Sequence, residues 1–203
     1  MITVKILYII FAYLCGSIPF AYLIAKAKGV DIRKVGSGNP GATNVFRTVG
    51  KVPGVITFIL DMAKGFLPVF AAKIIFNEPS FYYLMAIAAA AFIGHIYTVF
   101  LRFKGGKGMA TGCGVFLALL PSPVLIAVLV FAVVLILSGY VALASIMAAV
   151  TLPIATFLLS FGWEFVVFAG LAAALVIYKH KSNISRLISG TENRFKIFGS
   201  KNK

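Results

Sequence analysis

Apolar residues run along this chain in stretches long enough to cross a lipid bilayer. Three such runs stand out, at residues 2–25, 53–76 and 81–101. Each is close to the roughly 20 residues that the hydrocarbon core of a bilayer demands of a helix. The pattern therefore predicts three transmembrane helices in the first half of the chain.

The second half is harder to divide, because few charges interrupt it between residue 109 and Tyr178. Candidate breaks are the Pro-Ser-Pro at 121–123, the Ser-Gly at 138–139 and the Phe-Gly-Trp-Glu at 161–164. Proline and glycine in such positions punctuate helices. The breaks predict four further spans of about 14–20 residues, short enough that some lie with little tilt or are broken and partly buried in protein.

The amino-acid composition is also typical of an integral membrane protein. Hydrophobic residues make up 61% of it and charged residues 12%, and the mean hydropathy is +1.03. These values lie far from those of water-soluble domains. We therefore expect an all-α integral membrane protein with one membrane-embedded domain over residues 1–203. Cys15 and Cys113 show no spacing of a disulfide framework or a metal site and are interpreted as packing thiols.

The positions of the cations determine the predicted topology. Of the 19 Lys and Arg residues, 16 fall in residues 26–51, 102–107 and 179–203. The positive-inside tendency places these segments on the cytoplasmic side. An even number of crossings must then separate the last two, which gives seven spans with the N-terminus outside and the C-terminus cytoplasmic. A six-span alternative, with the Pro121 region inside one kinked helix, would leave seven cations outside.

We interpret the first run as a retained helix rather than a cleaved signal peptide. Near its start it carries only Lys5, whereas Lys26, Lys28, Arg33 and Lys34 follow it. Cations that follow an apolar run hold that end on the cytoplasmic side.

Three polar segments lie on the predicted cytoplasmic side, and the first, residues 35–51, reads VGSGNPGATNVFRTVGK. Gly36, Gly38 and Gly41 permit positive φ and close approach of a ligand. The compact polar side chains are Ser37, Asn39, Thr43 and Asn44. Such a segment can present several backbone N–H groups to an anion, although its composition alone fits an ordinary turn-rich loop equally well.

The second segment, residues 102–114, reads RFKGGKGMATGCG and combines glycines with cations ahead of a helix. This arrangement is typical of a phosphate-binding backbone. It lacks the spacing of a Walker A motif. The alternative, a basic anchor on anionic lipid, needs cations but not five glycines, and we favour the phosphate site.

The third segment, residues 178–196, begins where the last span ends. If the helix continues, His180 and Asn183 share one face, and His180 is a candidate proton acceptor or phosphate contact. The alternative for His180 is a solvated interface residue. Glu192, the only acid among the cations of this tail, is expected to pair with one of them and to fix the fold of the tail.

A few polar residues fall inside the predicted spans. Asp61 and Lys64 are three residues apart, so they can pair on one helix face. A structural ion pair is favoured slightly over a functional one, although charges in a membrane are functional candidates. For His95 and Ser145 we favour hydrogen bonds between helices over a place in the site.

Several reaction classes are excluded by what the sequence lacks. Phe100 and Ser185 stand five residues after the two histidines, so the H-x-x-x-x-D motif of coenzyme A-dependent glycerolipid acyltransferases is absent. A G-x-S-x-G elbow and a metal-ligand cluster are also absent. The rival class is a small transporter or channel for an organic anion. An inverted repeat is not evident, and the polar residues gather on one side of the membrane rather than at its midplane.

The three segments together resemble the acyl-phosphate-dependent glycerol-3-phosphate acyltransferases, the PlsY family of bacteria. The resemblance rests on SGNPGATN followed by Arg47, on KGGKGMAT and on KHKSNISRLISGTE, in that order. It implies transfer of an acyl group from an acyl phosphate to the 1-hydroxyl of sn-glycerol 3-phosphate, with lysophosphatidic acid and phosphate as products. It also implies an inner-membrane location with the active site facing the cytoplasm.

The resemblance assigns residues to roles as well. Ser37, Arg47, His180 and Asn183 are expected at the catalytic site, and Glu192 in a structural role. The expected substrate-binding residues are Asn39, Gly41, Thr43, Asn44, Lys104, Gly105, Gly106, Lys107 and Gly108. Neither a metal ion nor another cofactor is implied. The expected partners are the acyl phosphate, glycerol 3-phosphate and membrane lipids, without nucleic acid, and a monomer is compatible with this activity.

Overall fold

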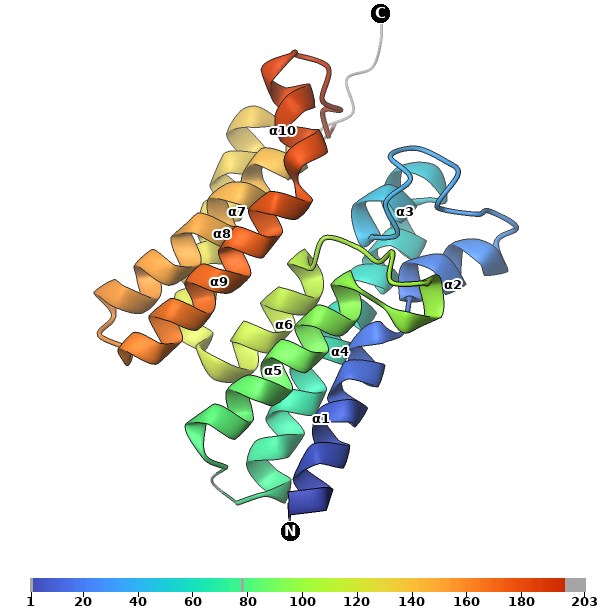
Figure 1. The fold of residues 1–203 in the computed structure, drawn as a ribbon. Coiled ribbons are helices and arrows are strands. Elements are labelled where there is room, and N and C mark those ends of the chain that lie inside the picture. The colour runs from blue at the N-terminus through green and yellow to red at the C-terminus, as the bar shows by residue number, and fades with distance from the viewer. Residues whose placement is uncertain (1, 78, 196–203) are drawn as a thin grey trace, which may run out of the picture. The chain divides into compact units, whose positions relative to one another are not determined.

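The computed structural model describes residues 2–77 and 79–195, and within these ranges it contains helices and no strands (Figure 1). The expected all-α class is therefore confirmed for the described residues. Two compact units, Met1–Leu119 and Leu120–Lys203, make up the chain, and each is described by itself. Lys196, the last residue of the third polar segment, lies outside the described residues.

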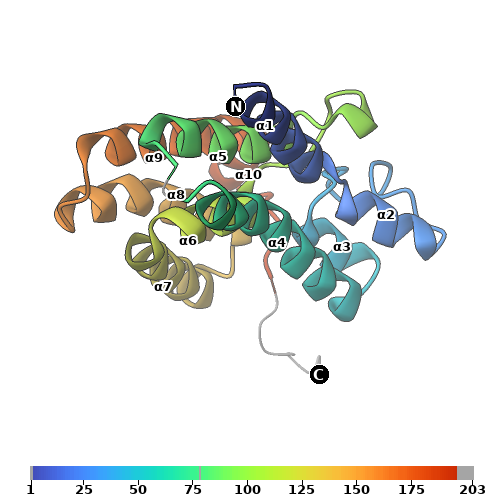
Figure 2. The ribbon, with the colours of Figure 1, turned by 90° about the horizontal axis from the view of Figure 1, so that it is seen from below.

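Four helices of the first unit pack in two pairs. α1 (Ile2–Ser17) lies along α5 (Phe81–Ile96), and α4 (Lys51–Ile75) lies along α6 (Met109–Leu119) (Figures 1 and 2). Glycines permit this approach: a Cβ on Gly16 would overlap the carbonyl oxygen of Ala91. Small residues at helix contacts are the usual way for helices in a membrane to pack, because lipid supplies no hydrophobic force between them.

Short elements at one end of this unit carry the first two polar segments. α1 ends at Ser17, and after Pro19 the chain turns into α2 (Phe20–Ala27). α3 (Ala42–Thr48) follows the loop of the first segment and packs on α4. The 3₁₀-helix η1 (Val99–Leu101) precedes the second segment.

The second unit contains α7 (Pro121–Ser138), α8 (Val141–Leu158), α9 (Trp163–Lys179) and α10 (Lys181–Ile188). All three predicted breaks are found. α7 begins at Pro121, where proline is tolerated because the first N–H groups of a helix have no partner within the helix. It ends at Ser138, and the next residue, Gly139, has a φ of 73° and makes the left-handed turn. The link from α8 to α9 contains Ser160, which also has a positive φ.

Five helical segments are long and apolar enough to cross a bilayer: Ile2–Ala27, Lys51–Ile75, Phe81–Leu101, Pro121–Ser138 and Val141–Leu158. The three spans expected in the first half are among them. α9 and α10 form a bent pair that would count as a sixth, and α6, with 11 residues, is shorter than a span. The count of seven and the orientation of the termini stay predictions.

Substitution of Gly16 by alanine is predicted to destabilise the first unit. The new Cβ has only backbone atoms of Ala91 in front of it, so α1 and α5 must separate. We expect a loss of about 1–3 kcal/mol, at about 2–4 °C in Tm per kcal/mol for a chain of this size. Thermal unfolding in detergent measures it.

The control for this prediction is Gly170→Ala in α9, where a Cβ would meet nothing within 4 Å. It changes helix propensity in the same way without a steric cost. Equal Tm values for the two variants would contradict close packing at Gly16.

Candidate active site

The loop of the first segment is organised around the side chain of Asn44. This side chain is buried, donates to the carbonyl oxygens of Ile32 (3.1 Å) and Val35 (3.0 Å), and accepts from the backbone N–H of Ser37 (3.0 Å). Asn44 thus closes the loop on itself. Its role in the structure is to hold Ser37 in place.

Ser37 lies between two glycines in the left-handed region. Gly36 has a φ of 59° and Gly38 of 68°, as the glycine pattern predicted. Gly41 does not use the positive φ that the sequence permitted: its φ is −145°, and it is the extended residue before α3. Ser37 is exposed, and its Oγ accepts from the N–H of Asn39 at 3.4 Å.

Thr43 and Arg47 lie on α3, four residues apart, so their side chains share one face of this helix. Thr43 is half-buried and Arg47 is exposed in the last turn. Because α3 packs on α4, the position of Arg47 is set by the core of the first unit.

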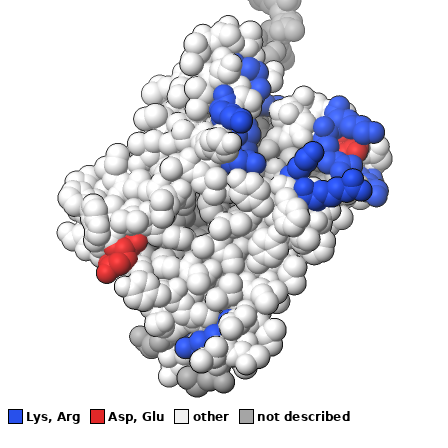
Figure 3. Space-filling model, viewed as in Figure 1, with Lys and Arg blue, Asp and Glu red and all other residues white. Residues whose placement is uncertain are grey.

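Positive charge gathers at this end of the first unit, over α2 and the loop after it (Figure 3). The exposed cations here are Lys26, Lys28, Arg33 and Lys34. The guanidinium of Arg33 donates to both carboxylate oxygens of Asp31, at 2.9 and 2.8 Å, and lowers the pKa of Asp31 to about 2. Asp31 is therefore ionised at neutral pH and offsets one cation, which leaves the surface strongly positive.

The second segment packs closely against the C-terminal end of α5. The N–H of Gly105 donates to the carbonyl oxygen of Ile96 (3.1 Å), and the N–H of Gly106 to that of His95 (3.2 Å). A Cβ on Gly105 would overlap the His95 carbonyl, and one on Gly106 would overlap the His95 ring. These two glycines are thus required by close packing, and their N–H groups bond to α5.

The N–H groups of this segment that suit an anion lie further along, at the start of α6. Gly108, with a φ of 88°, turns the chain into α6, which begins at Met109. The first N–H groups of a helix have no partner within the helix and bear a partial positive charge. Lys104 is exposed and Lys107 half-buried on the approach to this turn.

Residues of the first two segments meet at a small pocket. Its lining residues are Ser17, Pro19, Phe20, Pro40, Asp61, Lys64, His95, Thr98, Leu101, Gly105 and Gly106. Pro40 belongs to the first segment, and Gly105 and Gly106 to the second. Which residues of the two segments meet here could not be read from the sequence.

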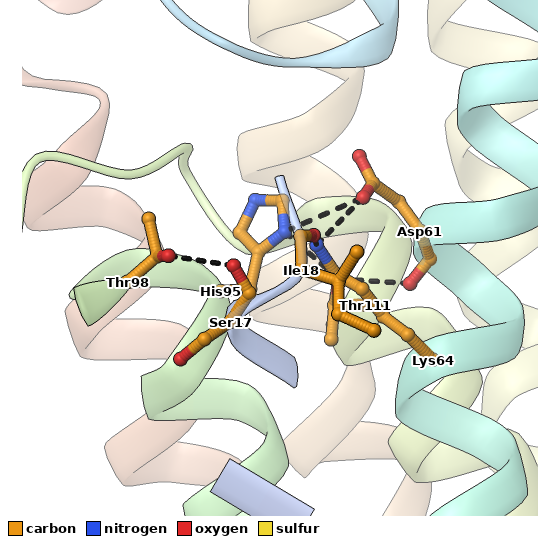
Figure 4. Close-up of polar contacts among 7 residues, drawn as sticks. All are labelled: Ser17, Ile18, Asp61, Lys64, His95, Thr98 and Thr111. Atoms are coloured by element: carbon orange, nitrogen blue, oxygen red, sulfur yellow. Dashed lines mark hydrogen bonds and ion pairs between the residues drawn. The ribbon is translucent and has the colours of Figure 1, made fainter. Parts of the chain in front are cut away.

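The pocket has a charged and polar wall inside the unit (Figure 4). Lys64 Nζ lies 2.7 Å from Asp61 Oδ1, both buried, so the predicted pairing of these residues is confirmed. His95 Nδ1 lies 3.0 Å from Thr111 Oγ1, which confirms the predicted hydrogen bond between helices. Thr111 is the last residue of the KGGKGMAT block, but the sequence assigned it no role, because a threonine at the start of an apolar helix does not show which residue of another helix it bonds to.

The third segment is bent rather than continuous. α9 ends at Lys179 and α10 begins at Lys181, with an angle of 59° between them, so the condition of one continuous helix is not met. His180 and Asn183 nevertheless stay adjacent, because the His180 carbonyl accepts from the Asn183 N–H at 2.8 Å. His180 is buried, so the alternative of a solvated residue is wrong.

One ring nitrogen of His180 has a defined role. Nδ1 lies 2.8 Å from the carbonyl oxygen of Val176, and a carbonyl only accepts, so Nδ1 carries a hydrogen. In the neutral ring, Nε2 is then the nitrogen with an acceptor lone pair. The backbone thereby fixes which side of the imidazole can take a proton.

Glu192 holds the third segment together. One carboxylate oxygen accepts from Arg186 Nε (2.8 Å) and the other from Asn183 Nδ2 (3.1 Å). The predicted pairing with a cation of the tail is thus found. Through it, the orientation of the Asn183 amide depends on Glu192.

These features describe a helical membrane protein with glycine- and lysine-rich loops suited to phosphate. The family model for glycerol-3-phosphate acyltransferases matches residues 6–190, and the chain belongs to this family. It is an integral membrane enzyme of the PlsY type, as the resemblance of the three segments predicted.

Relatives of this chain are similar over nearly their whole length. The glycerol-3-phosphate acyltransferase of Endomicrobium trichonymphae is 55% identical, with 98% of this chain and 99% of that one covered. The Aquifex aeolicus acyltransferase is 46% identical, covering 92% and 97%. Crystal structures of PlsY (YgiH) in a glycerol 3-phosphate form and a lysophosphatidic acid form superpose with TM-scores of 0.89 and 0.86, at 46% and 44% identity, covering 94% of this chain and 95% of each.

Replacement of Glu192 by alanine is predicted to lower acyltransferase kcat/KM by about tenfold or more, the effect expected when buried donors lose a charged acceptor. The Asn183 amide and the Arg186 guanidinium would both lose a partner. Activity and Tm in detergent measure the effect. The control is Glu164→Ala, an exposed acid in the first turn of α9; if both variants behaved alike, Glu192 would not orient the segment.

Proposed function

We propose that the acyl donor is an acyl phosphate, and that its acyl group passes to the 1-hydroxyl of sn-glycerol 3-phosphate. Lysophosphatidic acid and inorganic phosphate are the products. The observation that carries the proposal is the pocket at which two phosphate-suited segments meet. The solved PlsY structures named for glycerol 3-phosphate and lysophosphatidic acid support the acceptor and the product.

The chemistry of an acyl phosphate suits such a site. Phosphate is a good leaving group, so the donor is already activated and no covalent intermediate on the protein is needed. Orientation of the two substrates and stabilisation of their charges can supply most of the rate enhancement. Glycine-rich backbone and cations provide these two effects.

In the proposed arrangement, the turn at Gly108 and the start of α6 bind the leaving phosphate. Arg47, Lys104 and Lys107 bind the phosphate of glycerol 3-phosphate, with Ser37 beside them. The hydroxyl oxygen attacks the acyl carbon, the bond from that carbon to the phosphate oxygen breaks, and phosphate leaves with the bonding electrons. The hydroxyl proton passes to His180 Nε2 or to a substrate phosphate oxygen.

The proposed topology follows from the charges. Seven spans, with the N-terminus outside and the C-terminus cytoplasmic, place the three segments on the cytoplasmic side of the inner membrane. α6, with its 11 residues, is then a short span or one partly buried in protein. Exposed apolar side chains such as Leu137, at 81%, suit lipid contact, and the acyl chain of the donor would lie among the spans.

Donor identity is tested with purified protein in detergent. Given an acyl phosphate and glycerol 3-phosphate, it is expected to release phosphate and form the monoacyl product in equal amounts. Acyl coenzyme A is the control donor, for which we expect no comparable rate. Equal use of both donors would contradict the proposal, and absence of product together with anion uptake in proteoliposomes would support the transporter alternative.

The proton acceptor is tested at His180. His180→Gln keeps an amide near Nε2 that cannot accept a proton, and we expect kcat to fall about 100-fold, the lower end for loss of a general base. The rise of kcat with pH that a base produces would vanish as well. His180→Asn is the structural control, since its amide can still donate to Val176 O. Retained activity of His180→Gln across pH would assign the proton to a substrate phosphate oxygen.

A further inference from the structure

We propose that His95 and Thr111, supported by the backbone of Asp61, are positioning residues that hold residues 104–108 in their phosphate-binding shape. These three residues are called the His95 network, and residues 104–108 the glycine segment. The inference rests on the proposed function and assigns the buried polar cluster of Figure 4 a role in it. None of the three was expected among the substrate-binding residues.

The direction of the hydrogen bonds in the network follows from its geometry. Thr111 Oγ1 donates to the backbone carbonyl oxygen of Asp61 at 2.8 Å, because a carbonyl only accepts. A hydroxyl has one hydrogen, so towards His95 Nδ1, 3.0 Å away, Thr111 must be the acceptor. His95 Nδ1 therefore carries a hydrogen in either charge state of the ring, and the network runs from His95 through Thr111 to Asp61.

The glycine segment contacts this network at its middle and just beyond its end. In the middle, the Gly106 N–H donates to the His95 carbonyl, and a Cβ on Gly106 would meet the His95 ring. Beyond the end, α6 begins at Met109, and Thr111 is the third residue of that helix. His95 thus contacts the segment directly and, through Thr111, the helix start that follows it.

The network is anchored on α4, which packs closely against α6. A Cβ on Gly65 would overlap the carbonyl oxygen of Thr111, so the two backbones are in contact. Lys64 Nζ reaches both Asp61 Oδ1 (2.7 Å) and the carbonyl oxygen of Ile18 (2.6 Å), where α1 gives way to α2. The Asp61 carbonyl is therefore a fixed acceptor.

These hydrogen bonds are buried, so the loss of any one of them is costly. Thr111 is fully buried, and Asp61 and His95 are 2% and 6% exposed. A buried donor that loses its partner finds no water to replace it. If His95 loses its hydrogen-bond acceptor, its ring can reach a new one only by moving, and the ring lies against Gly106. Loss of a hydrogen bond in the network should therefore displace the glycine segment more than the rest of the first unit.

Thr111→Val tests this, with Thr111→Ser as the matched control. Valine keeps the shape and removes the hydroxyl, whereas serine keeps the hydroxyl. We expect valine to raise the KM for the acyl phosphate about tenfold, and serine to stay within about twofold of the parent. Equal KM values for the two variants, or a lower Tm for valine without a change in KM, would make Thr111 merely structural.

A double-mutant cycle tests the link to His95. Asparagine at 95 can still donate from near the Nδ1 position, whereas glutamine cannot, so His95→Asn should be milder than His95→Gln. If both residues act through one bond, His95→Gln combined with Thr111→Val should be no worse than the more severe single variant. Effects that multiply would overturn the proposal.

Backbone hydrogen exchange separates this inference from the proposed function. Thr111→Val should exchange faster than Thr111→Ser in the peptide covering residues 102–111, while peptides of α7 and α8 stay unchanged. This readout needs no substrate. Unchanged exchange in that peptide would overturn the positioning role of the His95 network. Faster exchange in a protein that does not use acyl phosphates as donors would support this role and contradict the proposed donor.

Discussion

The buried ion pair between Asp61 and Lys64 is the interaction on which the first unit depends. In a bilayer, a helix can end only where its freed backbone groups find partners. α1 ends at Ser17, and Lys64 donates to the Ile18 carbonyl that this end exposes, while Thr98 donates to the carbonyl of Ser17. The chain can therefore leave the helix and form a polar loop next to apolar surroundings.

Glycine has two different physical uses in the polar segments. In the first segment, Gly36 and Gly38 adopt positive φ and set the direction of Ser37. In the second, Gly105 and Gly106 allow the loop to lie on the end of α5, and their N–H groups bond to it. In the proposed arrangement a phosphate is therefore held by the start of α6 and not by these two glycines, so the binding groups belong to a helix.

Both histidines are held in the same way. His95 Nδ1 donates to Thr111, and His180 Nδ1 to the Val176 carbonyl, so in each neutral ring Nε2 is the acceptor. Their neighbours differ: His95 contacts the glycine segment, whereas His180 caps α10 close to Asn183 and Glu192. The contact with the glycine segment is the observation that supports the positioning role proposed for His95.

The sequence by itself determined the apolar spans, the three breaks, the family-specific segments and the pairing of Asp61 with Lys64. These depend on residues close in the chain, whose spacing fixes the helix face on which they lie. The contacts of His95 with Thr111 and of Gly106 with His95, and the meeting of Pro40 with the second segment, join residues on separate elements. Periodicity shows which face of a helix is buried but not which residue of another helix lies opposite. The 59° bend at His180 likewise could not be read from local spacing, because no proline marks it. Only the packed structure decided these contacts.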